Sequence, residues 1–339
     1  SISGTVTLAN PSDTVFPNVQ VFDQTGKWVW TQSPAADGTY AIALGLPTAT
    51  YYARTAGGRP YVNEVWNDNS CLTDCDVVAD GQPIQVTAPS TTAGVDFDLE
   101  AGIKLTGTVK DANTQAGIDD SVAEIFDTSG ERVAGCRVGA AGGFTCRQAI
   151  PPGTYYAATR NYAGYIDELH SDPRRVCVGG GPFCDVTRGD PIVVDLVTSP
   201  DPLDFTLDRG GWFAGAVIDA MDRRGLAGTP ILVYNHLGAL VTEIVWKQPL
   251  RLVPDGAYSS CGLPAGSYYA FTDSTDNGGH HADQLYDDLP CVQGCNPLDG
   301  TPIFVIQGTG TSDIDFELLG RLFGDGFESQ DTGGWTLSR

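Results

Sequence analysis

The chain is poor in basic residues and in histidine. Its 339 residues include 19 Lys and Arg against 42 Asp and Glu, which gives a formal net charge of −23, and only four histidines. Binding to the phosphates of a nucleic acid or to an anionic membrane surface requires clustered Lys and Arg. The charge therefore argues against both partners, and we expect the excess acid to keep the protein soluble and unaggregated.

Long apolar runs are also missing. No window approaches the roughly 18 consecutive apolar residues of a membrane-spanning helix, and no charged segment followed by an apolar one stands at the start. The first residue, Ser1, is compatible with the residue left after signal cleavage. We expect a secreted, extracellular protein of the cell surface, without a membrane span.

Motifs that carry catalysis or bind metal are not found. The four histidines are scattered, and the sequence has no Ser/His/Asp grouping, phosphate-binding loop, His-Glu-x-x-His or calcium loop. The densest group of candidate ligands is the segment 272–281, and its spacing matches no metal motif, so a solvated loop is favoured there. We expect no enzyme, no cofactor and no metal site.

The sequence does contain one pattern three times. Each copy opens on Gly-x-Val, closes on Asp-Phe-x-Leu, and includes a turn with two tyrosines, which reads Leu46-Pro47-Thr48-Ala49-Thr50-Tyr51-Tyr52, Ile150-Pro151-Pro152-Gly153-Thr154-Tyr155-Tyr156 and Leu263-Pro264-Ala265-Gly266-Ser267-Tyr268-Tyr269. A repeat this long is a domain rather than a solenoid unit. The pattern therefore predicts an array of similar domains.

Composition indicates the fold of each domain. Gly (42) and Pro (21) are frequent, helical periodicity is hard to find, and short alternating apolar runs stand between turns that contain glycine. Such a pattern predicts all-β, antiparallel β-sandwich domains. We place them at residues 1–101, 102–209 and 210–320, with linkers so short that a stiff rod is expected, and a strand-like tail at 321–339.

Eight of the nine cysteines stand in local pairs. Such pairs in an acidic, Gly-rich chain indicate an oxidising, extracytoplasmic compartment. Metal ligation is the alternative, but a tetrahedral zinc site needs four ligands, and the first and third repeats hold one pair each. We favour disulfides, with Cys261 left as a buried free thiol, and expect these pairs: Cys71 with Cys75, Cys136 with Cys146, Cys177 with Cys184, and Cys291 with Cys295.

The order of motifs resembles the carboxypeptidase regulatory-like domain. In each copy Gly-x-Val is followed by a hairpin, by Asp-Gly-x-Tyr or Gly-Gly-Phe, and by Leu-Pro-Ala-Gly-x-Tyr or a variant of it. The resemblance covers residues 1 to about 320 and implies transthyretin-like, immunoglobulin-like sandwiches, related to the B-type repeats of surface adhesins and often strung in tandem on secreted bacterial proteins. It implies a non-catalytic module. The segment 323–328 also resembles a C-terminal segment of secreted proteins of Gram-negative bacteria.

One departure from the adhesin repeats is informative. There, a Lys of the first strand bonds covalently to an Asn of the last strand. Here Lys104 lies on a predicted first strand, but the other repeats have no Lys at that place and the closing strands contain no Asn. We expect no internal isopeptide bond, and disulfides in its place.

An acidic and aromatic segment precedes a cysteine pair in every repeat. Its side chains could bind a sugar or a divalent cation, although recurrence in all three copies favours a structural role in a turn whose aromatic residue covers the core. The candidate residues are Glu64, Trp66, Asp68, Glu168, Asp172, Gln284, Tyr286 and Asp288.

Two hypotheses of function follow. In the first, the protein is a structural subunit of an extracellular bacterial filament whose only required partner is itself, and the apolar tail adds a strand to an uncovered edge at a short first strand of a neighbour's first domain. The interface would contain Ile2, Val6, Leu322, Phe323, Phe327, Trp335 and Leu337. In the second, it is a monomeric, adhesin-like module that binds glycans or a cell surface through the acidic loops; sorting or anchoring is a further use for the tail.

Overall fold

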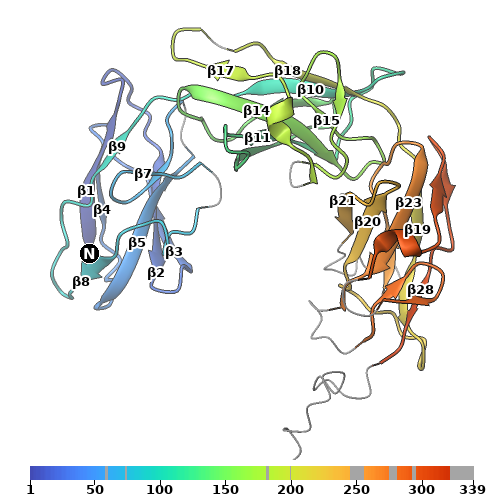
Figure 1. Ribbon diagram of the computed structural model, residues 1–339. Coiled ribbons are helices and arrows are strands. Elements are labelled where there is room, and N and C mark those ends of the chain that lie inside the picture. Colours follow the sequence, from blue (N-terminus) through green and yellow to red (C-terminus); the bar gives the residue numbers. More distant parts are fainter. Residues whose placement is uncertain are drawn as a thin grey trace, which may run out of the picture. The chain divides into compact units, whose positions relative to one another are not determined.

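The computed structural model describes residues 1–57, 60–72, 75–180, 183–198, 200–244, 256–274, 281–291 and 295–320. The tail at 321–339 therefore lies outside the described residues. Nearly all regular structure is β-strand (Figure 1), with short 3-10 turns at η2 (Val186–Arg188) and η4 (Pro297–Asp299). No described helix is long and apolar enough to cross a membrane. The prediction of an all-β chain with antiparallel sheets is confirmed.

The first repeat is built from two sheets. In the smaller sheet the central strand pairs antiparallel with one neighbour and parallel with the other, in the order β4 (Thr39–Ile42), β1 (Ile2–Leu8), β9 (Phe97–Leu99). The larger sheet has the order β3 (Trp28–Gln32), β2 (Asn18–Asp23), β5 (Ala49–Ala56), β6 (Glu64–Val65), β7 (Asn69–Ser70), and β8 (Ile84–Val86) pairs with the other half of β5.

The second repeat has the same two sheets. The smaller one has the order β13 (Gly143–Thr145), β10 (Thr106–Asp111), β18 (Leu203–Leu207). The larger one has the order β12 (Arg132–Arg137), β11 (Ser121–Phe126), β14 (Gly153–Asn161), β15 (Glu168–Leu169), β16 (Arg175–Val176), and β17 (Ile192–Val194) pairs with β14.

The third repeat follows the same plan. In its smaller sheet β19 (Trp212–Asp219) pairs with β22 (Ala257–Ser259), β27 (Gly310–Thr311) and β28 (Phe316–Leu318). The larger sheet has the order β21 (Leu240–Ile244), β20 (Ile231–Asn235), β23 (Gly266–Thr272), β24 (Gln284–Leu285), β25 (Leu289–Pro290), and β26 (Ile303–Val305) pairs with β23.

Compactness groups the chain into two units rather than three. One comprises Ser1–Arg160, Glu168–Arg175 and Asp185–Thr206, and the other comprises Asn161–Asp167, Val176–Cys184 and Leu207–Arg339. The strand order nevertheless repeats three times. The domain boundaries near Ala101 and Arg209 therefore remain a prediction.

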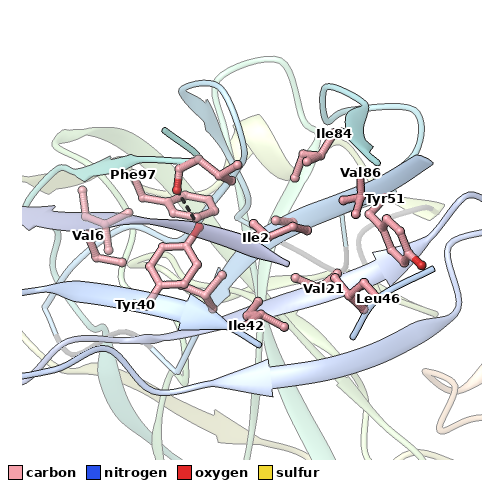
Figure 2. Packing of buried hydrophobic residues seen from close by; sticks show 14 of the residues in the cluster. Ile2, Val6, Val21, Tyr40, Ile42, Leu46, Tyr51, Ile84, Val86 and Phe97 are labelled. Atoms are coloured by element: carbon pink, nitrogen blue, oxygen red, sulfur yellow. Dashed lines mark hydrogen bonds between the residues drawn. The ribbon is translucent and has the colours of Figure 1, made fainter. Parts of the chain in front are cut away.

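The core of the first repeat lies between its two sheets. Alternate residues of each strand point inward, so that Ile2, Val21 and Phe97 are at most 1% exposed. Figure 2 shows the labelled side chains of both sheets meeting in one layer, with Tyr40 beside Phe97 at a ring-centroid distance of 6.4 Å. The Tyr40 hydroxyl donates to the carbonyl of Val95 at 2.5 Å.

The expected short first strand is not found. Strand β1 has seven residues, against six in β10 and eight in β19. It is paired with β4 on one side and with β9 on the other, and Ser1 accepts the N–H of Thr92. Ile2 and Val6 lie in their own core at 0% and 1% exposure. The prediction of a short first strand is wrong, because additional residues before Gly-x-Val do not lengthen the strand. In the second repeat Ile103 makes only an isolated bridge, and β10 begins at Thr106.

Close backbone approach explains the glycine of Gly-x-Val. A Cβ added to Gly4, Gly107 or Gly215 would lie 2.0 Å from the carbonyl oxygen of the residue that begins or precedes the last strand, Val95, Leu203 and Ile314 respectively. No side chain fits in that space. The first and last strands can therefore approach in parallel only when glycine stands there.

The tyrosine turn has an equally local cause. The hydroxyls of Tyr51, Tyr155 and Tyr268 donate to the carbonyls of prolines four residues earlier, at 3.2, 2.9 and 2.9 Å. Each bond fixes the chain as it enters the central strand of the larger sheet. The structure also pairs the cysteines as expected, Cys71–Cys75, Cys136–Cys146, Cys177–Cys184 and Cys291–Cys295. The Cys261 thiol, which forms no disulfide, is half-buried rather than buried and lies 3.8 Å from the Thr242 hydroxyl.

Candidate functional site

The acidic segments occupy the same place in each repeat, on the short strands β6, β15 and β24. The backbone N–H groups of Glu64, Glu168 and Gln284 donate to the hydroxyls of buried threonines at 2.9, 3.0 and 3.1 Å. Those threonines, Thr55, Thr159 and Thr272, lie on the central strand and are at most 1% exposed. Sequence reasoning missed them, although each stands four residues after the first tyrosine of its turn.

The side chains of these residues reach the last strand of the other sheet. The Glu64 carboxylate accepts the N–H of Asp98 at 3.0 Å, and the Gln284 side-chain oxygen accepts the N–H of Glu317 at 3.1 Å. In the second repeat Glu168 is paired with Arg174 at 3.3 Å, and the same guanidinium donates to the carbonyl of Thr206 on the last strand. In every repeat the segment thus joins the two sheets.

Burial raises the pKa of Glu64 to about 7. The nearby acids Asp68, Asp98 and Glu100 raise the pKa further, whereas the hydrogen bond from the Asp98 N–H lowers it. Gln284 supplies the same acceptor without a titrating group. The comparison indicates that the oxygen, rather than the charge, is what the site requires.

The aromatic residues of the segments cover the core. Trp66 packs against the core of the first repeat. The His170 ring lies edge-on to Phe205 with centroids 5.8 Å apart, and the Tyr286 ring lies edge-on to Phe316 at 6.2 Å. None of these side chains is free to form a flat binding platform.

The outer aspartates belong to turns. Asp68 and Asp288 are exposed and have positive φ, 63° and 59°, as the second central residue of a tight hairpin turn often does. The N–H of Asp172 donates to the carboxylate of Asp190 at 2.8 Å. Within the described residues no group of three His, Cys, Asp or Glu side chains could hold a metal ion. These observations favour the structural interpretation of the predicted ligand residues.

The hollow beside β9 has a volume of about 510 Å³. Its lining includes Glu64, Asp68, Asp98 and Glu100. A space surrounded by like charges in a chain of net charge −23 repels acidic partners. The outer edge of β9 is therefore poorly suited to accept another acidic chain.

The first cysteine pair covers the outer face of the larger sheet. Cys71, 2% exposed, packs with Phe22, Val65 and Val77 in a small second cluster. The Arg54 guanidinium lies over the Phe22 ring, 5.2 Å from its centroid. Cys71 and the half-buried Cys75 thus cover Phe22, Val65 and Val77 on this face.

The opposite edge of the same sheet is different. Strand β3 ends the sheet and carries Trp28 at 55% and Trp30 at 37% exposure. The Trp28 indole N–H donates to the Thr31 hydroxyl at 3.0 Å, and Val29 packs against the core. Sequence reasoning missed these tryptophans as candidate site residues, although Trp28-Val29-Trp30 stands just after a turn that contains Gly26.

The chain leaves each sandwich at one fixed place. The second residue after the last strand bridges to the start of the acidic segment in all three repeats, as Tyr61 with Ala101, Tyr165 with Arg209, and His281 with Gly320. We call this pair the exit bridge. A backbone hydrogen bond of 2.9 Å accompanies each one, from Val62 to Glu100, from Ile166 to Asp208, and from Ala282 to Leu319.

The expected interface residues divide into two groups. Ile2 and Val6 are core residues of the first repeat, so their side chains are not available for contact with another subunit. Leu322, Phe323, Phe327, Trp335 and Leu337 lie outside the described residues.

Comparison with known proteins gives no family. No family model and no curated protein matches the chain, so the resemblance to carboxypeptidase regulatory-like domains stays a hypothesis. Among solved structures, the chain is similar to the Bacillus anthracis TIE protein at 12% identity and a TM-score of 0.24, over 94% of this chain and 50% of that one. The chain thus spans half the length of that protein.

Two further solved structures are pilins. The chain is similar to BcpA, the major pilin subunit of Bacillus cereus, at 11% identity and a TM-score of 0.21, over 94% of this chain and 99% of that one. It is similar to a streptococcal ancillary pilin at 12% identity and a TM-score of 0.28, over 95% and 99%. Scores this low assign neither a family nor a function to the chain.

Proposed function

We propose that the protein is a structural subunit of an extracellular bacterial filament or surface fibre. In this proposal the subunit polymerises head to tail, and residues 321–339 of one copy add a strand to the next. Strand addition supplies main-chain hydrogen bonds at an open sheet edge, while alternate side chains enter pockets. A contact between two different surfaces of the same chain yields an open filament when its rotation does not close into a ring.

The exit bridge is the observation that carries the proposal. In the first two repeats the chain continues from Ala101 and Arg209 into the next sandwich, whereas from Gly320 it continues into the apolar tail. The tail thus takes the position in the chain that a following sandwich has elsewhere. Its content of Phe323, Phe327 and Trp335 exceeds what a solvated spacer needs.

The structural roles of the candidate ligand residues also support the proposal. Glu64 and Gln284 bind the last strand of their own repeat, and the aromatic residues of the same segments pack on the core. What remains is a chain of disulfide-bonded sandwiches, suited to an oxidising environment outside the cell. The alternative, a monomeric glycan-binding module, has less support, because Trp66 and Tyr286 pack toward the core.

Electron microscopy of the purified chain beside a version that ends at Gly320 tests the proposal. Filaments from the full chain and separate particles from the shortened chain are expected. Separate particles from both would reject polymerisation by the tail. Retention of either chain on a glycan array, lost when Trp66 and Tyr286 are replaced by Ala, would instead favour the glycan-binding alternative.

A further inference from the structure

Strand β3 is an open edge with apolar side chains on it. Within the described part of the chain it pairs with β2 alone. Trp28 lies opposite Phe22, on the outer face of the sheet, and Trp30 lies opposite Val21, which is a core residue. Exposed edge strands of natural proteins usually carry charges or prolines that prevent pairing with another chain. β3, with the sequence Trp-Val-Trp-Thr-Gln, carries neither.

The equivalent strands of the other repeats do carry charges. The register that places Trp28 opposite Phe22 places Arg132 opposite Phe126 and Leu240 opposite Tyr234. Strand β12 has Arg132 and Arg137, and β21 has Glu243. A charge at an edge disfavours the approach of an apolar strand, because the charge would lose water.

The second repeat is also closed covalently along this side. Cys136 lies on β12 and Cys146 follows β13, so the disulfide between them joins the edges of the two sheets. The residue equivalent to Cys136 is Gln32 in the first repeat, opposite Val19. The gap between β3 and β4 therefore has no such cross-link. Of the three equivalent edges, β3 is the one suited to accept a strand.

The tail has the matching properties. Trp335 and Leu337 alternate with Thr336 and Ser338, so that in a strand both apolar side chains would lie on one face. These four residues are uncharged, as are the five of β3. In a chain of net charge −23, two uncharged segments avoid the repulsion that acidic surfaces of two copies would suffer. At about 3.3 Å per residue, residues 321–339 span up to roughly 60 Å, which leaves ample chain between Gly320 and the strand.

We infer that the β3 edge of the first repeat accepts the segment 335–338 of a second copy of this chain, with Trp28 and Trp30 as its contact residues. This inference rests on the proposed function and identifies the acceptor that the function requires. The incoming strand extends the larger sheet of the first repeat, and its Trp335 side chain pairs across the strands with the tryptophan that lies on the same face of the sheet.

The test uses two complementary variants of the chain. The variant Trp28→Lys with Trp30→Lys keeps the tail but carries two charges on the edge. The chain that ends at Gly320 keeps the edge but has no tail. Leu240→Lys, at the equivalent position of the third repeat, is the matched control. Assembly is followed by electron microscopy and by analytical ultracentrifugation, and near-UV circular dichroism verifies that each variant is folded.

The inference predicts filaments from the unmodified chain and from Leu240→Lys. The double tryptophan variant should stay monomeric even at concentrations roughly tenfold above those at which the unmodified chain assembles. Alone, the double variant and the tail-less chain should each stay monomeric, since the double variant has no acceptor and the tail-less chain has no donor. Mixing the tail-less chain with the unmodified chain should shorten the filaments, because each tail-less copy accepts a strand and donates none.

Donation by the double variant is tested directly. Its tail is intact, so it should form a stable pair with the edge of a tail-less chain, one copy of each. Assembly should stop at this heterodimer, because one chain can only donate a strand and the other can only accept one. Larger species would contradict the inference. Mixing the double variant with the tail-less chain should therefore yield heterodimers and no filaments.

Failure of the inference is distinguishable from failure of the function. Filaments from the folded double variant would overturn β3 as the acceptor while leaving the filament proposal intact. A folded double variant that stays monomeric but forms no heterodimer with the tail-less chain would also overturn it. Monomers from the unmodified chain itself would reject the proposed function and the inference together.

Discussion

Glu64 on β6 accepts the backbone N–H of Asp98 on β9 at 3.0 Å, and so a buried carboxylate of one sheet satisfies a strand of the other. Strand β9 pairs with β1 on one side, and the Glu64 side chain provides the acceptor on its other side. A buried N–H without an acceptor is costly. Gln284 makes the same contact with Glu317 in the third repeat.

Replacement of Glu64 by Gln should stabilise the first repeat at neutral and alkaline pH. Because burial raises the Glu64 pKa to about 7, above its ordinary value of 4.5, the folded state binds more protons, and stability falls as pH rises from about 4.5 to about 7. The Gln variant keeps the hydrogen-bond acceptor but has no titrating group, so its stability should not decrease over this pH range. The measurement is the melting temperature, with hydrogen exchange of the Asp98 amide, at pH 5 and pH 8.

The reverse change at Gln284 provides the control. Gln284→Glu should introduce into the third repeat the pH dependence that Glu64→Gln removes from the first. Glu64→Ala should cost about 1–3 kcal/mol at either pH, because it leaves the Asp98 N–H without its acceptor. Equal pH dependence of the Gln variant and the unmodified chain would show that Glu64 does not titrate as inferred.

Tyr40→Phe should lower the free energy of unfolding of the first repeat by about 1 kcal/mol, through loss of the hydrogen bond to the Val95 carbonyl. Phe144 occupies the equivalent position opposite Gly107. That residue shows that the ring alone is compatible with the fold, so the variant should remain folded. Denaturant unfolding measures the change, and an unaltered midpoint would contradict it.

Gly107→Ala should destabilise the second repeat by about 3 kcal/mol, since the new methyl group would meet the Leu203 carbonyl oxygen and force the strands apart. Gly143→Ala is the control. Gly143 lies in the neighbouring strand β13, has open space around its Cβ position, and should change stability by less than about 0.5 kcal/mol. Similar midpoints for both variants in denaturant unfolding would refute the close approach.

Removal of the disulfides should have unequal effects. The loop between Cys136 and Cys146 spans ten residues of sequence and that between Cys71 and Cys75 spans four. Loop-closure entropy predicts losses of about 3 and about 2 kcal/mol when each pair is replaced by Ala. Urea unfolding of the two variants measures both losses. A larger loss at Cys71 and Cys75 would indicate that their packing with Phe22 outweighs the entropy of the loop.

Repetition of local motifs made much of the fold predictable. Gly-x-Val, the tyrosine turn and the cysteine pairs each act over short distances, and their recurrence predicts strands, hairpins and pairings. The Pro-x-x-x-Tyr hydrogen bond is closed within five residues, and so the sequence contains all of it. The predicted disulfide partners are likewise neighbours in the chain.

The candidate site was less predictable. The sequence singled out Glu64 and Gln284, but the threonines that hold their backbone and the strands that they bind lie nine to 34 residues away. The expectation of a short, uncovered first strand was wrong, because pairing with the last strand depends on contacts about 90 residues apart. Exposure of Trp28 and Trp30 likewise depends on which strand ends the sheet.

By itself the sequence determined the all-β class, the threefold pattern, the local turns, the acidic charge and the local disulfide pairs, because side-chain alternation, glycine conformation and loop closure act locally. Only the tertiary structure decided which edge is open, which acid bridges the sheets and which apolar residues stay exposed. Those properties arise from the order of strands in a sheet, and strand order is set by the sum of many distant contacts rather than by any one segment.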